Sequence, residues 1–473
     1  MKTIRILRAR DIFLLLVLLS LALSCGSDDN GMDCPDPTNA DCDQVGDDPQ
    51  DDDPQDDDPV VLEPTLLSVA PMTGPKHTVV TITGKNFGTD PDKVSVSFNG
   101  TPGEVRSITD TWITVKVPVR AYTGPITMVV DGFDLTGPEF VYELSVFVET
   151  FAGGERGYED GSGTAAKFDR PNDLVRDSKG NIFVADRRNH AIRKIAPSGQ
   201  VTTLARVGEP GQEDGEFDLP KGLAIDGDDN IYVADSGNNR IVMIDPNGVW
   251  SIIAGGNGSG YVNGAGNVAL FNNPSAILVG DDGDNALYVS DQFNHAIRRI
   301  SLDDNQYTVS TYAGPTIDNQ PGDTNGGLSQ ARFNYPRGMA KSGDGTILLA
   351  DYSNNIVRVI DQNAESVERF AGIGRGYASN LHRMEAWFRN PSDISVAEDG
   401  NIYIADALNH CIRRIDPEGH VTTIAGVPET EGYEDGASAG ALFNRPQGVL
   451  HGGEGEIYVA DTFNNVIRKI SVE

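Results

Sequence analysis

One arrangement of side chains that could do chemistry, Asp-x-x-Asn, occurs six times along this chain of 473 residues. Its copies begin at Asp186, Asp235, Asp291, Asp351, Asp406 and Asp461. Carboxylates bind hard metal ions and act as general acids or bases, but a group present in every copy cannot be the one site of a single active centre. Short polar side chains also satisfy N–H groups in tight turns. We therefore expect a structural role for this motif.

Two further positions of the repeat carry polar side chains. An arginine follows the Asp by seven residues in five copies: Arg193, Arg298, Arg358, Arg413 and Arg468. The second copy has Val242 there and Arg240 two residues earlier. His190, His295 and His410 occupy a position that Asn holds in the other copies. We expect the arginines to be struts common to the repeats and the histidines to be turn residues.

Long glycine-rich loops between the repeats carry five aromatic residues, namely Tyr158, Tyr261, Tyr377, Trp387 and Tyr433. Aromatic rings flanked by Asp, Asn and Arg suit a carbohydrate, because a sugar ring presents flat C–H patches beside its hydroxyls. We predict that these residues bind ligand on one face, with Trp387 contributing most, since aromatic anchors usually dominate recognition. The alternative for the tyrosines is packing between repeat units, because the Gly-Tyr pair itself recurs.

These residues must be positioned by a repeat architecture, since the six aspartates, from Asp186 to Asp461, lie 49 to 60 residues apart. Each unit can be read as four short strands, the first beginning after a Phe-x-x-Pro segment. With Asn-His at positions 189–190, 294–295 and 409–410, the units resemble the NHL repeat. This resemblance implies a six-bladed β-propeller over residues 145–473. The sixth unit lacks a fourth strand, and we expect residues 145–153 to supply it and close the ring.

The first-strand positions differ between repeats, and in a propeller they surround the mouth of the central channel. Lys221 and Arg337 are candidate ligand contacts there, or partners of Asp173 and Asp393. Asp173 and Asp393 are candidate ligands of a structural calcium ion; we predict no other cofactor. The nearby turns add second-rank contacts, namely Arg187, Arg188, Phe293 and Tyr352.

Residues 64–144 are predicted to form a separate all-β unit of short alternating strands bounded by Gly, Pro and Asn. The segments P-x-x-G near Pro71, I-x-G-x-N-F-G from Ile82 and V-x-F-N-G from Val96 resemble the IPT/TIG family. This resemblance implies an immunoglobulin-like sandwich that acts as a spacer. The predicted fold class is thus all-β, an immunoglobulin-like β-sandwich followed by a six-bladed β-propeller.

The N-terminus reads as a targeting signal. Residues 1–24 have a basic start and an apolar stretch that is short for a membrane span, and they end in LALSC at Cys25. They resemble a bacterial lipoprotein signal peptide, which implies lipidation of Cys25. Asp28 and Asp29 resemble the surface-export signal of Bacteroidetes lipoproteins. Residues 25–63, rich in Asp and Pro, predict a disordered acidic tether, and pairing of its Cys34 and Cys42 stays open.

The formal net charge of −33 argues against a nucleic-acid partner. We predict a non-catalytic lipoprotein on the outer membrane, exposed at the cell surface and attached through its lipid anchor. It would bind an extracellular ligand, a glycan for a polysaccharide uptake system, with other outer-membrane uptake components as further partners. One alternative is a propeller hydrolase, lactonase or lyase-like enzyme with a metal in the channel. Another is a platform that binds proteins.

Overall fold

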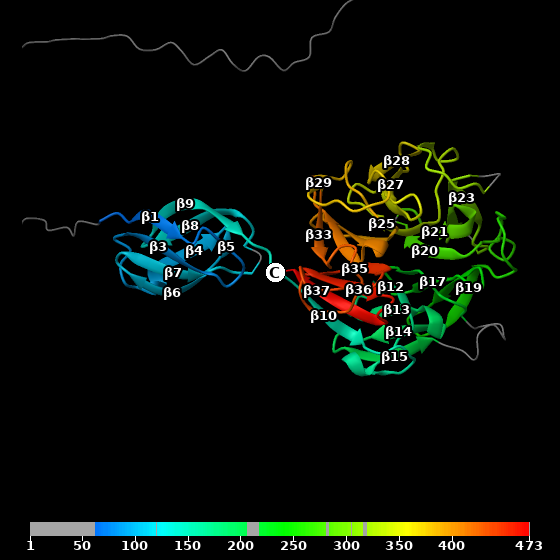
Figure 1. The fold of residues 1–473 in the computed structure, drawn as a ribbon, viewed down its shortest axis with the longest axis horizontal. Helices are drawn as coiled ribbons and strands as arrows, with labels where there is room; N and C mark the ends of the chain where they lie inside the picture. Colours follow the sequence, from blue (N-terminus) through cyan, green and yellow to red (C-terminus); the bar gives the residue numbers. More distant parts are fainter. Residues whose placement is uncertain are drawn as a thin grey trace, which may run out of the picture. The chain divides into compact units, whose positions relative to one another are not determined.

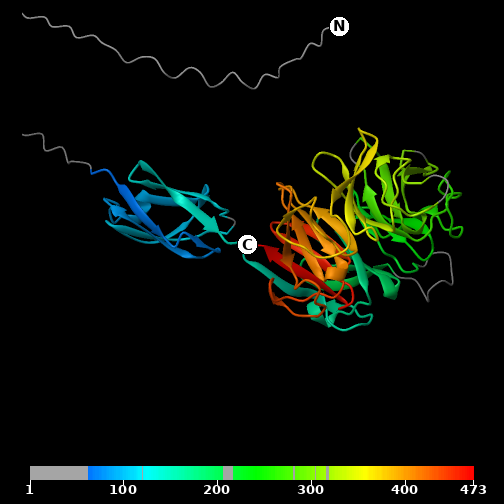
Figure 2. The same cartoon turned by 45° about the horizontal axis from the view of Figure 1, so that its top comes forward.

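The computed structural model describes residues 62–119, 121–205, 217–280, 283–303, 305–315 and 319–472. The predicted signal peptide, the lipidation site Cys25 and the tether up to residue 61 lie outside the described residues. Two all-β parts follow one another along the chain (Figures 1 and 2). Within the ranges described, no helix has the length and apolar character needed to cross a membrane.

The first part is a sandwich of two sheets. One sheet has the order β1 (Thr65–Ala70), β3 (Val79–Lys85), β7 (Trp112–Lys116) and β6 (Glu104–Thr109). The other has the order β2 (Thr73–Gly74), β9 (Phe133–Tyr142), β8 (Gly124–Val130), β4 (Val94–Phe98) and β5 (Thr101–Pro102). Neighbouring strands are antiparallel except that β2 runs parallel to β9. A short 3-10 turn, η1 (Pro91–Lys93), leads into β4.

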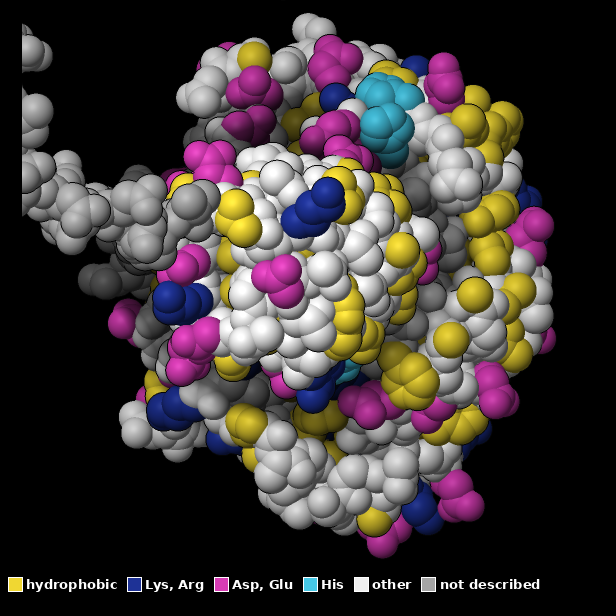
Figure 3. All heavy atoms as spheres, turned by 90° about the vertical axis from the view of Figure 1, so that its left-hand side faces the viewer, with side chains coloured by type: hydrophobic (Ala, Val, Ile, Leu, Met, Phe, Trp, Pro, Cys, Tyr) yellow, Lys and Arg dark blue, Asp and Glu magenta, His cyan; other side chains and the backbone are white. Residues whose placement is uncertain are grey.

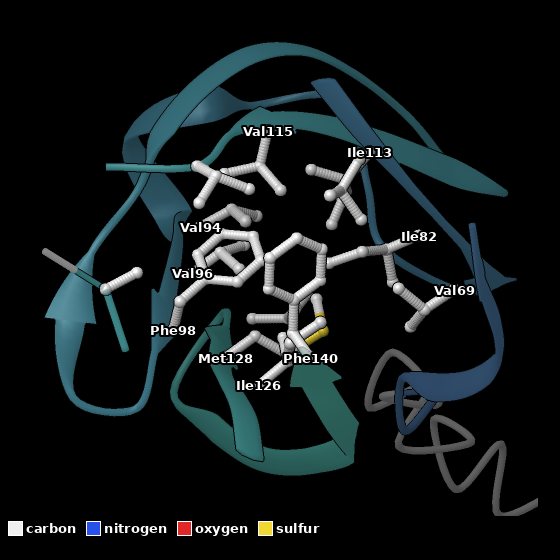
Figure 4. Packing of buried hydrophobic residues seen from close by; sticks show 14 of the residues in the cluster. Val69, Ile82, Val94, Val96, Phe98, Ile113, Val115, Ile126, Met128 and Phe140 are labelled. Atoms are coloured by element: carbon white, nitrogen blue, oxygen red, sulfur yellow. The ribbon is translucent and has the colours of Figure 1, made fainter. Parts of the chain in front are cut away.

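Alternating burial explains why these strands form a sandwich. Along β8, every second residue from Gly124 to Val130 is buried, which is the period of a strand with one face toward a core. Figure 4 shows the inward side chains of both sheets filling that core. The rings of Phe98 and Phe140 meet edge to face with their centroids 5.1 Å apart, a favourable aromatic geometry. The predicted immunoglobulin-like sandwich is confirmed.

The second part consists of six sheets, the blades of a propeller. From the channel outward, blade 1 contains β12 (Pro171–Arg176), β13 (Ile182–Asp186), β14 (Ala191–Ile195) and β15 (Gln200–Ala205). Blade 2 contains β16 (Leu223–Ile225), β17 (Ile231–Asp235), β18 (Arg240–Ile244) and β19 (Trp250–Gly255). Blade 3 contains β20 (Pro274–Val279), β21 (Ala286–Asp291), β22 (Ala296–Ser301) and β23 (Val309–Ala313).

The last three blades follow the same plan. Blade 4 contains β25 (Pro336–Lys341), β26 (Ile347–Asp351), β27 (Ile356–Asp361) and β28 (Ser366–Ala371). Blade 5 contains β30 (Pro391–Val396), β31 (Ile402–Asp406), β32 (Cys411–Ile415) and β33 (His420–Ala425). Blade 6 contains β35 (Gly448–Gly453), β36 (Glu456–Asp461), β37 (Val466–Val472) and β10 (Val146–Gly153). Four of the blades have an additional two-residue strand at their outer edge: β11 (Gly161–Ser162), β24 (Gly326–Gly327), β29 (Leu381–His382) and β34 (Gly436–Ala437).

The ring closes through strands that are far apart in the sequence. Innermost strands contact their neighbours in the order β12, β16, β20, β25, β30 and β35, and β35 contacts β12. In blade 6, β10 pairs antiparallel with β37, with Val146 opposite Val472 and Val148 opposite Ile470 (Figure 1). β10 thereby supplies the fourth strand of this blade. The predicted six-bladed propeller is confirmed.

Apolar cores lie between neighbouring blades rather than within each one. Tyr232 and Ile241 of blade 2, for example, belong to the same buried cluster as Ile277 and Leu287 of blade 3. Five phenylalanines of the Phe-x-x-Pro segments are fully buried, namely Phe168, Phe271, Phe333, Phe388 and Phe443. Because each blade completes the core of the next, the ring fixes where the first-strand residues and the turns beside them lie.

Candidate functional site at the channel mouth

The repeated Asp-x-x-Asn motif holds each blade together. Asp186 Oδ1 accepts a hydrogen bond from the N–H of Asp169 at 2.8 Å. Its Oδ2 accepts from Asn189 Nδ2 at 2.8 Å and from Arg193 Nη1 at 2.9 Å. Burial raises the pKa of Asp186 to about 6, while the bonds from Asn189 and Arg193 oppose that rise. The other copies repeat this pattern, so the expected structural role is confirmed.

The strut arginines complete the same network. Arg193 is fully buried and also donates to the carbonyl oxygens of Lys167 and Glu159. In the second repeat, Val242 occupies the position of the strut arginine. Arg240 takes over the contact there, because its Nε donates to Asp235 Oδ2 at 2.7 Å. Breaking such a buried ion pair by removing one partner is costly, because the partner that remains is an uncompensated buried charge.

The variable His or Asn of the turn links each blade to the next. His410 Nδ1 accepts from the N–H of Arg445 at 3.3 Å, and Asn465 Oδ1 accepts from the N–H of Arg170 at 3.0 Å. The remaining links join His190 to Leu219, Asn239 to Asn273, His295 to Tyr335 and Asn355 to Asn390. Six such bonds circle the ring. Imidazole and amide interchange here because each offers one acceptor, which confirms that the histidines are turn residues.

Each of the four predicted tyrosines packs against a strut arginine. The guanidinium of Arg193 lies 4.9 Å from the ring centroid of Tyr158, and those of Arg298, Arg413 and Arg468 lie 4.8, 4.9 and 5.2 Å from Tyr261, Tyr377 and Tyr433. Each hydroxyl is hydrogen-bonded to a threonine: Thr203, Thr311, Thr423 and Thr150. Each tyrosine thus packs against its own blade rather than between two, while Tyr158 and Tyr433 are 39% and 47% exposed, so ligand binding by the tyrosines stays a prediction.

Trp387 lies in the loop before blade 5 and is 38% exposed. Its backbone bridges to Ala378, and its carbonyl accepts from Arg413 Nη1 at 3.2 Å. It lines neither of the two cavities described below. Phe293 is also exposed, and its ring meets Tyr335 edge to face. Ligand binding by Trp387 stays a prediction.

A cavity of about 230 Å³ lies at one mouth of the channel. It is lined by the starts of the innermost strands and by the turns after the second strands. It brings together the first-strand candidates Lys221, Arg337, Asp173 and Asp393 with the turn residues Arg187 and Tyr352. These six residues come from blades 1, 2, 4 and 5. Arg188, exposed in the same turn as Arg187, does not line it.

Five cationic side chains line this cavity: Arg170, Arg187, Lys221, Arg337 and Arg445. Burial lowers the pKa of Lys221 well below its usual value, and the neighbouring charges of Arg337 and Arg187 lower it further. Burial also lowers the pKa values of Arg337 and Arg187. Lys221 Nζ donates to the amide oxygens of Asn273 and Gln292 rather than to a carboxylate.

The remaining cations are held by aromatic rings and amides. The Arg337 guanidinium lies 3.5 Å from the Tyr352 ring centroid and donates to Gln447 Oε1. Arg170 and Arg445 lie 4.5 and 4.7 Å from the ring centroid of Phe463. Among the described residues, none of the five cations forms an ion pair, so the alternative pairing of Lys221 and Arg337 with Asp173 and Asp393 is wrong.

The two carboxylates are bound by backbone N–H groups. Asp173 accepts from its neighbour Leu174 and, across the blade boundary, from Leu223 at 2.8 Å. Asp393 accepts from Val449 of blade 6 at 2.8 Å. Burial raises the pKa of Asp173 to about 6. Burial and the nearby charge of Asp173 raise the pKa of Asp393 well above its usual value, because two close carboxylates do not both ionise readily.

Glycines on alternate blades make room for these aspartates. The second inner-strand position reads Asp173, Gly222, Ala276, Gly338, Asp393 and Gly448 around the ring. A Cβ on Gly338 would lie 2.1 Å from Asp393 Oδ1, and one on Gly448 would lie 3.0 Å from the Asp173 Cα. The neighbouring blades therefore approach too closely for any larger residue.

The predicted calcium site does not fit this donor set. Calcium takes six to eight oxygen ligands, whereas the described residues contain no group of three acidic, histidine or cysteine side chains able to hold a metal. Both aspartates are already hydrogen-bonded to backbone N–H groups and share a cavity with five cations. The calcium ion stays an untested prediction, and we assign it no role.

A second cavity, of about 430 Å³, runs along the channel beyond the mouth. Asp173 and Asp393 line both cavities and so mark the boundary between them. Beyond them the wall combines apolar inner-strand residues such as Leu174 and Ile277 with the polar side chains of Arg176, Lys341 and His451.

Sequence reasoning missed three of the lining residues, Arg170, Arg445 and Phe463. Arg170 and Arg445 precede the leading prolines of blades 1 and 6, at a position that has positive φ in all six repeats. Phe463 occupies the turn position of Phe293. An inter-repeat comparison of the residue before each proline could have revealed the two arginines, because the other copies have Leu, Asn or Tyr there.

Comparison with known proteins agrees with both parts of the fold. Residues 64–142 match the IPT/TIG domain, and residues 168–195, 217–242 and 388–415 match the NHL repeat. The chain is 28% identical over 339 residues to Protein SUPPRESSOR OF QUENCHING 1, chloroplastic, of Arabidopsis thaliana, covering 69% of this chain and 27% of that protein. It is 28% identical over 331 residues to NHL repeat-containing protein 2 of Gallus gallus, covering 62% of this chain and 45% of that protein. The chain thus spans less than half the length of these relatives.

Two solved structures show the same fold over most of the chain. A Bacteroides thetaiotaomicron protein of unknown function has a TM-score of 0.59 and 25% identity, covering 88% of this chain and 99% of that one. An auxiliary nutrient binding protein from Bacteroides ovatus has a TM-score of 0.56 and 18% identity, covering 87% and 98%. The chain therefore carries an IPT/TIG domain followed by a propeller built of NHL repeats.

Proposed function

We propose that this protein is a non-catalytic binding protein whose propeller takes an extracellular ligand, a glycan, at the channel mouth. The observation that carries the proposal is the convergence of non-repeated polar side chains on one cavity, while the repeated ones bind the blades together. Arg187, Lys221 and Arg337 reach this cavity from three blades. A concave site with a few convergent polar groups is the usual form of a ligand site. The auxiliary nutrient binding protein of the same fold supports a binding role.

Polar groups at the mouth suit the hydroxyls of a sugar. Amide side chains of Asn172 and Gln447 line it beside the cations, and Tyr352 and Phe463 add apolar surface. The volume of about 230 Å³ is below the roughly 300–1,000 Å³ of sites for drug-sized ligands. A single sugar unit, free or at the end of a longer chain, is the size of group that we expect to enter.

The side chains at the mouth that could act as catalysts already have structural partners. Asp173 and Asp393 accept hydrogen bonds from backbone N–H groups across blade boundaries. The hydroxyls of Ser275 and Ser392 donate to backbone carbonyls, including those of Pro336 and Gln447. A nucleophile needs an adjacent base to activate it, and no histidine is among the residues that line this cavity. We therefore favour binding over the enzymatic alternative.

We further propose that the chain is attached to the outer membrane through a lipid on Cys25 and faces outward. Support comes from the LALSC site and the acidic pair Asp28 and Asp29. Protease treatment of intact cells tests it with wild type and Cys25→Ala. The wild type is expected to be cleaved. Its protection while a known surface protein is cut would refute outward display.

The binding proposal is tested by passing residues 26–473 over a glycan array and by titrating each hit in solution. We expect at least one oligosaccharide to bind and to be recovered unchanged after long incubation. Trp387→Ala and Tyr352→Ala then decide between the loop before blade 5 and the channel mouth, with the larger loss expected for Tyr352→Ala. An array without hits would refute glycan binding. Release of cleaved product would support the enzymatic alternative.

A further inference from the structure

The channel mouth is basic although the protein is strongly acidic. The whole chain has a formal net charge of −33. Four arginines, one lysine and two carboxylates line the mouth; burial raises the pKa of both carboxylates and, with the charges of Arg337 and Arg187, lowers the pKa of Lys221. On the face of the molecule seen in Figure 3, acidic and basic side chains are scattered among neutral ones. The collection of cations in one cavity is therefore a local feature.

These cations lack the negative partner that buried charges normally have. Buried lysine and arginine side chains are usually paired, because an unpaired charge loses its hydration without compensation. Lys221 contacts two neutral amides and Arg337 contacts a tyrosine ring and an amide. The side chain of Arg187 forms no hydrogen bond or ion pair with any described residue, and its Nε is buried. The site therefore carries unbalanced positive charge.

Asp173 and Asp393 do not pair with these cations, although the charge of Asp218 acts on Arg187 and that of Asp169 acts on Arg170. Asp173 and Asp393 lie at the inner end of the mouth, and each is engaged by backbone N–H groups. In the described residues, neither approaches a cation of the mouth within the 4.0 Å of an ion pair. The nearby charge of Asp173 and burial raise the pKa of Asp393.

We propose that the channel mouth binds its ligand through a small anionic group, a carboxylate, sulfate ester or phosphate ester, held by Arg187, Lys221 and Arg337. This inference rests on the proposed binding function and adds the chemical class of the ligand. Guanidinium groups donate two parallel hydrogen bonds to planar or tetrahedral oxyanions. Arg337 is pre-positioned by Tyr352 and Gln447, whereas the side chain of Arg187 donates to no residue in the described ranges.

Size and charge restrict the ligand to a small acidic group. A long polyanion would have to approach an acidic protein, which opposes it, and a mouth of about 230 Å³ has no room for its chain. Within a cavity walled by protein, the field of the cations is focused and screened less than at an open surface. The mouth thus distinguishes an acidic sugar unit from its neutral counterpart.

The test uses residues 26–473 and isothermal titration with glucuronate, glucose and inorganic sulfate. Glucuronate and glucose share a ring and differ in the carboxylate, so their comparison isolates the charge. We expect glucuronate to bind at least about tenfold more tightly than glucose, and the difference to shrink as salt is raised. Arg187→Gln should remove the preference. Arg188→Gln is the matched control, because it deletes the same charge from the same turn outside the cavity.

The outcomes separate this inference from the binding function. Equal affinities for glucuronate and glucose would overturn the anionic class and leave glycan binding intact. Binding of sulfate but of neither sugar, lost in Arg187→Gln, would support the anionic site and count against a glycan ligand. Equal losses in Arg187→Gln and Arg188→Gln, or no binding of glucuronate or sulfate at millimolar concentration, would overturn the site. Lys221→Gln, checked by its melting temperature, gives a second variant whose unchanged affinity would also contradict it.

Discussion

The ring of links between blades makes a sharp prediction about one histidine. His410 Nδ1 accepts the N–H of Arg445 in the next blade at 3.3 Å. Replacing His410 with Ala removes the acceptor and leaves that N–H without its partner. A buried donor left unsatisfied costs about 1–3 kcal/mol. The bond is long and Arg445 is partly exposed, so we expect a loss near the lower end, about 1–2 kcal/mol.

The assay is calorimetry of the thermal unfolding of the full chain, with three variants compared. A loss of 1 kcal/mol lowers Tm by about 2–4 °C in domains of 150–250 residues and by less in larger ones, so we expect a fall of about 1–3 °C for His410→Ala. His410→Asn should keep most of the stability, because Asn465 accepts the equivalent N–H at 3.0 Å. His410→Gly controls for backbone strain, since His410 has a φ of 57° that glycine adopts freely.

The variants also define the result that would refute this reasoning. If the hydrogen bond matters, the His410→Gly variant must be less stable than wild type, although glycine relieves the backbone strain at this position. Should His410→Gly melt at or above the wild-type temperature, the conformation at this position, and not the link to Arg445, would decide stability. Equal losses for Asn and Ala would likewise show that the acceptor contributes nothing.

Three further predictions concern the propeller. Deleting residues 145–153 should lower Tm or cause oligomerisation, because it removes β10 and exposes an edge of blade 6; a melting temperature equal to that of the parent would contradict ring closure. Arg193→Met should cost about 3–5 kcal/mol in chemical denaturation because it leaves Asp186 as an uncompensated buried charge, and the double variant with Asp186→Asn should cost less. As pH falls from 7 to 5, the double variant His295→Asn, His410→Asn should gain in Tm relative to wild type. Burial lowers the pKa of both histidines, so the stability from their neutral forms is full above the unfolded pKa of about 6.5 and is lost as pH falls through the folded pKa; a constant difference in Tm would refute this.

Local features of the sequence were enough to predict the fold and the structural motifs. The repeat is visible in the sequence because each unit has the same alternation of apolar and polar residues and the same turns. The turns are recognisable because their backbone geometry favours Asp, Asn and Gly. The roles of Asp186, Asn189 and Arg193 follow from residues at most seven positions apart. The strand at Val146–Gly153 was recognisable because it reads like the fourth strands of the other units.

The site itself depended on the tertiary structure. Tyr158 and Trp387 looked like binding residues in sequence, but nothing in a linear chain shows whether a ring packs on an arginine or faces solvent. Arg187, Arg337 and Arg445 are far apart in sequence and share a cavity because the ring closes. Charge repulsion and burial at the mouth, and the pKa shifts that they cause at Asp173 and Lys221, exist only after six blades meet, since both effects depend on distances through space.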